Sequence, residues 1–285
     1  MCLDVNENGI KNIDMSDSVI VIPIHKNLIE LTNSERISLT RTLEVFADND
    51  VFLLISESID RNEYNSFYSQ HLKYIIISEA HFKDIDSYSK LLMSSFFYSL
   101  FRKYTWMLIC QLDVFVFKND LISFTVRNDF FYVGAPIIGA NLKDWNNISW
   151  VGNGGLSLRR IDKCLTVTNK LESLKKLIWV LGKNFTKGRG FIFSLFRFLI
   201  GKSFSINYNK YLTRYLNDFK VNEDVFWSLW VPTLFSDLKP ADINTATRFS
   251  FEVSPEKIYK SVCRLPMGCH AWEKYNPDFW RNYIQ

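Results

Sequence analysis

The amino-acid sequence predicts an α/β fold in which a mostly parallel sheet is covered by helices on both faces. Short runs of aliphatic residues alternate with amphipathic helical segments over residues 18–120, as in parallel strands joined by helical crossovers. The runs are almost continuously apolar, which is typical of strands buried on both faces. Ligands of such sheets bind beyond the carboxyl ends of the strands.

Four strands are expected in this first half, each dominated by Val, Ile, Leu or Phe. They are SVIVIPIHK (18–26), VFLLISES (51–58), YIIIS (74–78) and WMLICQLDVFVF (106–117), the last being the most apolar in the chain. Because parallel strands end at one edge of a sheet, the polar residues near their ends should share that edge. These residues are His25, Ser56, Glu57, Ser78 and Asp113.

Two helices are expected between the strands. Residues 34–48 place Ile37, Leu39, Leu43 and Phe46 at helical spacing, with Ser34 as a plausible N-cap. Residues 87–104 form a long amphipathic stretch. Beyond residue 120 the pattern becomes mixed and ends in a tryptophan-rich segment.

The composition excludes several classes of protein. With 47% hydrophobic and 22% charged residues, the 285-residue chain is globular rather than disordered. Five cysteines without a CxxC pair indicate reduced thiols rather than a disulfide frame or a zinc site. An uncharged apolar run of 18 residues and a signal-peptide pattern are both missing. The lack of GxGxxG and GxxxxGK[ST] motifs disfavours nicotinamide dehydrogenases and P-loop nucleotidases.

The stretch SWVGNGGLSLRR (149–160) places three of the chain's 11 glycines within four positions. Glycine admits a positive φ or a close approach of the backbone to another group, at a cost in conformational entropy. The stretch is therefore either a tight turn that leads into a strand or a loop whose backbone meets a ligand.

Asp113 is a lone acid within an apolar strand pattern. A buried carboxylate costs several kcal/mol unless it is paired or bound to a metal. One interpretation is a structural carboxylate that a backbone NH or an arginine satisfies. The other is that the strand delivers Asp113 to the ligand edge, where a carboxylate can hold a divalent cation that bridges phosphates.

Two further stretches contain candidate chemical groups. Glu223 and Asp224 precede an apolar helical run; they either complement the helix dipole or place a general base in a pocket. His270 lies between a glycine turn and Trp272. It is either a structural histidine or, as a neutral imidazole, a ligand for a manganese-like cation beside a carboxylate.

Several of these motifs resemble those of a known family, in the same order along residues 18–280. VIPIHK, QLDVFVF, VGAP, VGNGGLSLRR, NEDVFW and GCHAWEK are similar to motifs of bacterial GT-A-type nucleotide-sugar glycosyltransferases from polysaccharide (O-antigen or capsule) clusters. The resemblance implies a GT-A-like, Rossmann-type, mostly parallel sheet with a basic helical insertion. It also implies one catalytic domain over 1–285, with a nucleotide-binding half at about 18–120 and an acceptor half at 121–285.

The resemblance further implies roles for individual residues. In an inverting transferase, Asp224 would deprotonate the acceptor hydroxyl beside Glu223, Asn153 would bond a sugar hydroxyl, and either Arg159 or Arg160 would face the diphosphate. The implied metal ligands for Mn²⁺ or Mg²⁺ are Asp113 and His270, although the family's DxD motif reads Gln111-Leu112-Asp113 here, with a single acid. The implied donor site comprises Pro23, His25, Glu57, Lys90, Gln111, Asp113, Asn153, Gly154, Gly155 and Arg159.

Positive charge is concentrated in residues 171–220, which contain ten Lys or Arg and two acids, whereas the remainder has a net charge of −4. Within this segment, residues 174–204 are basic, aromatic and apolar. They form either a helical hairpin on the core or an interfacial segment at an anionic membrane surface. The second interpretation fits a lipid-linked glycan acceptor and a location at the cytoplasmic face of the membrane. Nucleic acid is a poorer partner, because no binding motif accompanies the charge.

The composition, the motifs and the resemblance bear on three possible functions. The first is an inverting glycosyltransferase that uses a nucleotide-sugar, most simply a UDP-sugar, in surface polysaccharide synthesis. The second is a catalytically degenerate GT-A-fold scaffold or carbohydrate-binding protein, which the single acid at Asp113 keeps open. The third, a nucleotidyltransferase, would need a glycine-rich phosphate loop after the first strand, and PIHKN does not supply one.

Overall fold

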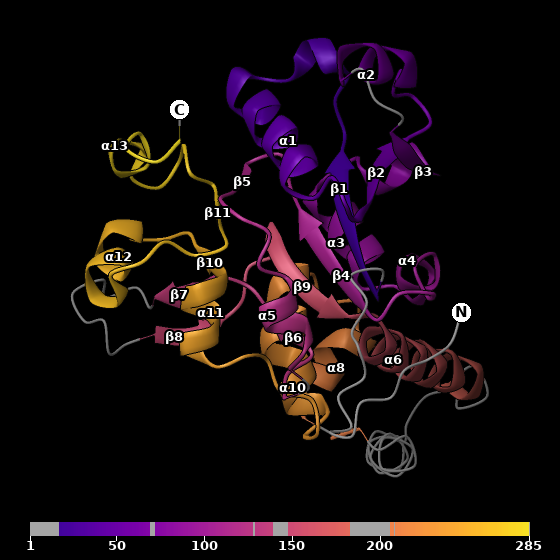
Figure 1. The fold of residues 1–285 in the computed structure, drawn as a ribbon. Helices are drawn as coiled ribbons and strands as arrows, with labels where there is room; N and C mark the ends of the chain where they lie inside the picture. Colours follow the sequence, from indigo (N-terminus) through magenta and orange to yellow (C-terminus); the bar gives the residue numbers. More distant parts are fainter. Residues whose placement is uncertain are drawn as a thin grey trace, which may run out of the picture.

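A mixed sheet forms the centre of the computed structural model, which describes residues 17–68, 72–127, 129–138, 148–182, 206–207 and 209–284. Within these ranges the sheet has six strands in the order β3-β2-β1-β4-β9-β6 (Figure 1). The strands are β1 (Ser18–Ile24), β2 (Asp50–Ser56), β3 (Lys73–Ile77), β4 (Trp106–Cys110), β6 (Tyr132–Val133) and β9 (Leu156–Arg160). β3, β2, β1 and β4 run parallel, and β9 is antiparallel to both of its neighbours. The predicted mostly parallel α/β sheet is confirmed.

Both faces of the sheet are covered, because alternate residues of each strand point to opposite sides. Ile20 and Ile22 of β1 pack in one cluster with Leu39 of α1 (Asn33–Val45). Val19 and Val21 pack in the other cluster, together with apolar residues of the helices on that side. Those helices include α3 (Ile85–Leu92), α4 (Ser95–Ser99), α6 (Ile161–Gly182), α8 (Lys210–Leu216) and α10 (Val231–Leu234).

Smaller elements complete the described part of the chain. A second sheet has the order β10-β11-β5, formed by β10 (Ser250–Phe251), β11 (Gly268–His270) and β5 (Val114–Val116), and β7 (Pro136–Ile138) pairs with β8 (Ile148–Val151). The remaining helices are α2 (Arg61–Tyr68), α5 (Ile122–Thr125), α9 (Glu223–Val225), α11 (Ile243–Phe249), α12 (Pro255–Val262) and α13 (Pro277–Trp280). A π-helical turn, Phe226–Trp230, continues α9, and short 3₁₀ turns lie at Leu28–Glu30 and Glu79–His81.

The expected strand over 106–117 is wrong in one respect. It is two strands, β4 and β5, that belong to different sheets, and the turn between them contains Gln111 and Asp113. Asp113 is therefore not buried within a strand: its side chain is 51% exposed. The two polar residues end the first strand because neither can be buried on the apolar face that the strand presents.

Two helix predictions also need correction. The stretch 87–104 is not one helix, because α3 ends at Leu92 and α4 begins after Ser94, whose hydroxyl accepts a hydrogen bond from the Phe97 NH and caps the second helix. The first helix is capped by Thr32 rather than Ser34. Thr32 and Glu35 bond each other's backbone NH groups in a reciprocal capping box.

The basic segment is described only at its two ends. α6 and α8 carry part of its charge, whereas residues 183–205 lie outside the described residues, as does most of the apolar run predicted for a membrane surface. None of the helices in the described ranges has the length and apolar character needed to cross a bilayer.

Candidate functional site

A cavity of about 430 Å³ opens where β1 and β4 end. The strand order runs outward from β1 to β3 on one side and continues from β1 to β4 on the other, so the cavity lies at the topological switch point where sheets of this kind bind ligands. The aromatic rings of Phe82 and Tyr88 lie nearly parallel, 6.3 Å apart. The lining residues are Pro23, His25, Lys26, Glu35, Phe82, Asp84, Ile85, Tyr88, Gln111, Leu112 and Asp113.

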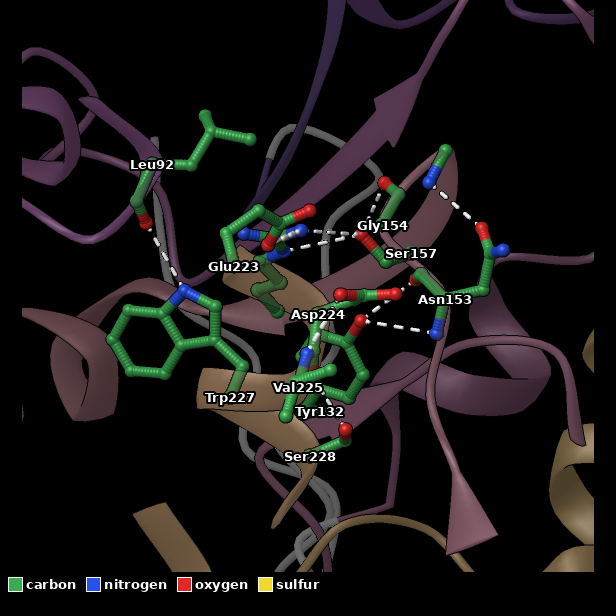
Figure 2. Close-up of polar contacts among 12 residues, drawn as sticks. Leu92, Tyr132, Asn153, Gly154, Ser157, Glu223, Asp224, Val225, Trp227 and Ser228 are labelled. Carbon is green, nitrogen blue, oxygen red and sulfur yellow. Dashed lines mark hydrogen bonds and ion pairs between the residues drawn. The ribbon is translucent and has the colours of Figure 1, made fainter. Parts of the chain in front are cut away.

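Glu223, Asp224 and His270, three of the predicted site residues, lie next to Gly154 and Gly155. A Cβ atom on Gly154 would lie 1.8 Å from Oε1 of Glu223, and one on Gly155 would lie 2.1 Å from the ring of His270. Such distances are far below van der Waals contact. Glycine is therefore required here because two side chains of the protein itself, those of Glu223 and His270, approach the backbone. Asp224 lies beside Glu223 (Figure 2).

His270 is held between two carboxylates. Its Nε2 atom is 3.2 Å from Oδ1 of Asp113, and its Nδ1 atom is 3.2 Å from Oε1 of Glu252. Strand pairing places His270 opposite Val114, next to Asp113 in the chain. Burial alone would lower the pKa of His270, but the two carboxylates outweigh burial and raise it to about 9.

Glu252 continues this chain of contacts to the glycine turn. Its Oε2 atom accepts a hydrogen bond of 2.6 Å from Nδ2 of Asn153, and Oδ1 of Asn153 accepts one of 2.8 Å from the Gly155 NH. The Asn153 carbonyl in turn accepts a bond of 2.6 Å from the hydroxyl of Tyr132. The turn is thus fixed by side chains from β6 and from the end of β10.

A second cluster holds Glu223 from the opposite side. Arg159 is completely buried, with Nη2 2.7 Å from Oε2 of Glu223. The guanidinium also donates to the hydroxyls of Ser157 and Tyr98. Burial raises the pKa of Glu223 to about 7, although Arg159 acts to lower it. The ion pair therefore ties the start of α9 to strand β9.

Asp224 is the less restrained of the two acids. Its Oδ1 atom accepts a hydrogen bond of 2.7 Å from the Val225 NH, and its side chain is only partly buried. Burial raises the pKa of Asp224, against the hydrogen bond from Val225. Downstream, the indole of Trp227 donates to the Leu92 carbonyl over 3.0 Å and fixes this segment against α3 (Figure 2).

The structure does not bring every predicted donor-site residue to the cavity. Pro23, His25, Gln111 and Asp113 line it. Glu57 is exposed on the turn after β2 and does not line it, and Lys90 lines a separate cavity between α3, α6 and the segment before α9.

Two other predicted roles need correction. Arg159 has no exposed surface and is committed to Glu223, so it is not presented to a diphosphate. Arg160 pairs with Asp162 at the surface. The side chain of Asn153 is buried, and both its amide groups are already bonded within the protein, so it is not free to bond a sugar hydroxyl.

The predicted metal ligands fit a cation in part. His270 Nε2 is buried and makes no well-aligned hydrogen bond, and it lies 3.2 Å from Asp113 Oδ1, close to the roughly 3 Å that separates neighbouring ligands of a small octahedral cation. In the described ranges no third His, Cys, Asp or Glu completes a cluster with them. A cation at this pair would therefore take its other ligands from phosphate and water, as Mg²⁺ commonly does.

Sequence reasoning missed Glu252 and Tyr88. Glu252 follows the apolar run FSF (249–251), and a lone acid after apolar residues is the same signal that singled out Asp113. Tyr88 has no such signal, because its place in the wall of the cavity depends on where α3 begins.

Comparisons with solved structures find similar folds in glycosyltransferases. One is the apo form of GlyE from Streptococcus pneumoniae TIGR4, at 12% identity and a TM-score of 0.45, covering 94% of this chain and 60% of that one. Another is mouse xyloside xylosyltransferase 1, at 11% identity and a TM-score of 0.48, covering 88% and 96%. A third is the galactosyltransferase LgtC in complex with donor and acceptor sugar analogues, at 9% identity and a TM-score of 0.47, covering 88% and 86%.

At these identities and TM-scores, function has to be judged from the site itself. This chain also spans only about 60% of the Streptococcus protein. No curated protein matches the sequence. Residues 71–270 match the family described as protein of unknown function DUF5672. This match covers more than half of the sequence, including the glycine turn, both acids of α9 and His270, and the chain belongs to the DUF5672 family.

Proposed function

We propose that this protein is a glycosyltransferase that moves a sugar from a nucleotide-sugar, a UDP-sugar in the simplest case, to a hydroxyl group of a glycan acceptor with inversion. One observation carries the proposal: Asp113, His270, Glu223 and Asp224 meet at Gly154 and Gly155, and Asp113 also lines the cavity at the carboxyl ends of β1 and β4. A transferase of this kind needs a flat nucleotide site, a positive or metal-binding locus for the diphosphate, and one base.

The cavity supplies the nucleotide site. The near-parallel rings of Phe82 and Tyr88, with Pro23 and Ile85, offer an apolar surface on which a base can lie. A nucleotide bound there would extend its diphosphate toward Asp113, which lies in the turn after β4. Gln111 hydrogen-bonds the Tyr88 hydroxyl over 3.4 Å and so connects the aromatic wall to the QLD turn.

Asp113 and His270 would hold the divalent cation, which would displace the proton that Nε2 carries at neutral pH, where the pKa of His270 of about 9 keeps the ring protonated. When bound, a cation there neutralises charge that develops on the departing diphosphate. Glu252 and the backbone around Ala271, whose NH bonds the Asp113 carbonyl over 3.0 Å, keep the two ligands facing each other.

Asp224 is the better candidate for the base. Glu223 is buried against Arg159, so its carboxylate is occupied by a structural ion pair. Asp224 is partly exposed, and its raised pKa suits a group that must accept a proton near neutral pH. In this assignment the acceptor hydroxyl loses its proton to Asp224 as its oxygen displaces the nucleoside diphosphate from the anomeric carbon.

Thermal stability with a panel of nucleotide-sugars, with and without Mn²⁺, tests donor binding. At a hundred times its Kd, a ligand of the native state adds about 2.7 kcal/mol of stability, or roughly 4–5 °C in Tm for a chain of this size. We expect at least one UDP-sugar to produce such a shift, and Asp113→Asn to reduce it. The absence of a shift with every nucleotide and nucleotide-sugar would contradict the proposal.

A carbohydrate-binding protein of the same fold without transferase activity is a second candidate. The observation that favours it is the single acid of the QLD turn, where Gln111 stands in place of a second carboxylate. Release of UDP from a UDP-sugar distinguishes the two, because a binding protein would be stabilised by the ligand without producing UDP.

The acceptor is proposed to be lipid-linked, at the cytoplasmic face of a membrane. Lys175, Lys176 and the 60% exposed Trp179 lie on α6, where the basic segment begins, and Arg214 lies on α8 after it. Lysines near an anionic bilayer contribute about 1 kcal/mol each to binding, and aromatic side chains settle at the headgroup level.

Neutralising Lys183, Lys187 and Lys202 to glutamine should therefore reduce binding to phosphatidylserine-containing vesicles by about two orders of magnitude. Replacing Lys118, Lys257 and Lys260 with glutamine is the charge-matched control and should leave binding unchanged. Cosedimentation with vesicles measures both. Equal binding by the two triple variants would count against a specific membrane surface in the basic segment.

A further inference from the structure

We propose that Glu252 is a positioning residue that sets the orientation of both His270 and the Gly154–Gly155 turn. This role in the reaction rests on the proposed transferase function. The family match assigns no role to this residue. Its two partners, Asn153 and His270, are evident from the contacts between the second sheet and the glycine turn.

The contacts of Glu252 are few and specific. Each carboxylate oxygen has its own partner: Oε2 accepts from Asn153 Nδ2 over 2.6 Å, and Oε1 is 3.2 Å from His270 Nδ1. The residue is only 9% exposed. Its partners are 99 and 18 positions away in the chain. A buried carboxylate costs free energy unless its oxygens are satisfied, and here Asn153 and His270 supply the compensation.

For His270, the consequence concerns which nitrogen faces the site. A carboxylate at Nδ1 keeps a proton on that nitrogen and fixes the plane of the ring. Nε2 is then the atom presented to Asp113 and to the space beside Gly155, where a Cβ atom would collide with the ring. Without Glu252 the imidazole could rotate or exchange its tautomer.

For the turn, the consequence concerns the amide of Asn153. An ionised carboxylate has no hydrogen to donate and can only accept hydrogen bonds. The NH₂ group of Asn153, which is the donor, must therefore face Glu252. The amide oxygen is then directed at the Gly155 NH, to which it is bonded over 2.8 Å. One carboxylate therefore determines the orientation of the side chain that holds the turn against Glu223 and His270.

Glu252→Gln tests this role, with Glu256→Gln as the matched control, since Glu256 makes a surface pair with Lys260 on α12. Two-bond ¹H–¹⁵N NMR of histidine-labelled protein reports the protonation of each ring nitrogen, and loss of a signal in His270→Asn identifies His270. The spectra are recorded above pH 9, because at lower pH both ring nitrogens of His270 carry a proton, and in the wild type we expect the remaining proton on Nδ1. In Glu252→Gln we expect the His270 signals to shift, with kcat reduced about 10–100-fold and the KM for the donor changed less than threefold.

An unprotonated Nδ1 in the wild-type protein would overturn the proposal, and this measurement needs no variant to fold. Unchanged His270 signals in a folded Glu252→Gln, or a kcat equal to that of Glu256→Gln, would overturn it as well. Failure of the transferase function has a different signature, because the wild-type protein would then turn over no donor while the NMR arm still reports on Glu252.

Discussion

Replacing Asp224 with asparagine is expected to lower turnover by about 10²–10⁴-fold while the Kd for the donor stays within a factor of three. The amide cannot accept the acceptor's proton, and removal of a general base costs about this much. It nevertheless retains the shape of the side chain and an oxygen for the Val225 NH. Initial rates of sugar transfer, together with calorimetric titration of the donor, measure the two quantities separately.

Asp278→Asn is the control for this substitution, because Asp278 of α13 is 79% exposed and pairs with Arg281, which directly follows the helix. It should behave as the wild type does. Turnover of Asp224→Asn within threefold of the control would show that Asp224 is not the base. Glu223 would remain an unsuitable replacement, since its carboxylate is held by Arg159.

Replacing Arg159 with methionine is expected to destabilise the protein by about 3–5 kcal/mol, the usual cost of removing one partner of a buried ion pair. Methionine fills much of the same space, so the cost arises chiefly from leaving Glu223 without its countercharge. Chemical denaturation measures the free energy of unfolding. Arg160→Met is the matched control, because the ion pair of Arg160 with Asp162 lies at the surface, where such pairs contribute up to about 1 kcal/mol.

The cost of Arg159→Met should also depend on pH. Burial already raises the pKa of Glu223 from 4.5 to about 7, and Arg159 acts to lower it, so losing Arg159 raises this pKa further. An acid with a raised pKa in the folded state binds its proton more tightly when folded, so stability falls as pH rises from 4.5 through the folded-state pKa. Arg159→Met should therefore be least destabilising near pH 5 and most destabilising near pH 8. A cost that is the same at both pH values would contradict the ion pair.

The fold could be predicted where the hydrophobic pattern of one segment is enough to identify it as a strand or a helix. β1, β2 and β3 were predicted from their continuous apolar runs, and their observed bounds lie within two residues of the predicted ones. The expected burial of the third strand was wrong: β3 is at the edge of the sheet, and Ile76 is 47% exposed. The breaks were not predicted. Ser94 and Gln111 interrupt segments that are otherwise continuous in hydrophobicity, and whether such a residue ends an element depends on its tertiary surroundings.

The site could be predicted residue by residue but not as a network. Asp113 was identified as a lone acid in an apolar pattern, and Asp224 and His270 were identified by their places before a helical run and beside a glycine turn, together with the family resemblance. Arg159 was given a ligand role although its partner is Glu223. From the resemblance, the backbone at Gly154 and Gly155 was expected to approach the donor. The structure shows that they make room for Glu223 and His270, a relation between residues more than 60 positions apart that no local pattern encodes.

The most direct test of the site is an experimental structure of the protein with Mn²⁺ and the UDP-sugar that stabilises it most. We predict that the uracil lies beyond the carboxyl ends of β1 and β4, against Phe82 and Tyr88, with the diphosphate at Asp113 and His270 and the anomeric carbon within reach of an acceptor oxygen bonded to Asp224. A nucleotide bound elsewhere, with Asp113, His270 and Asp224 all distant from the diphosphate and the sugar, would contradict the account.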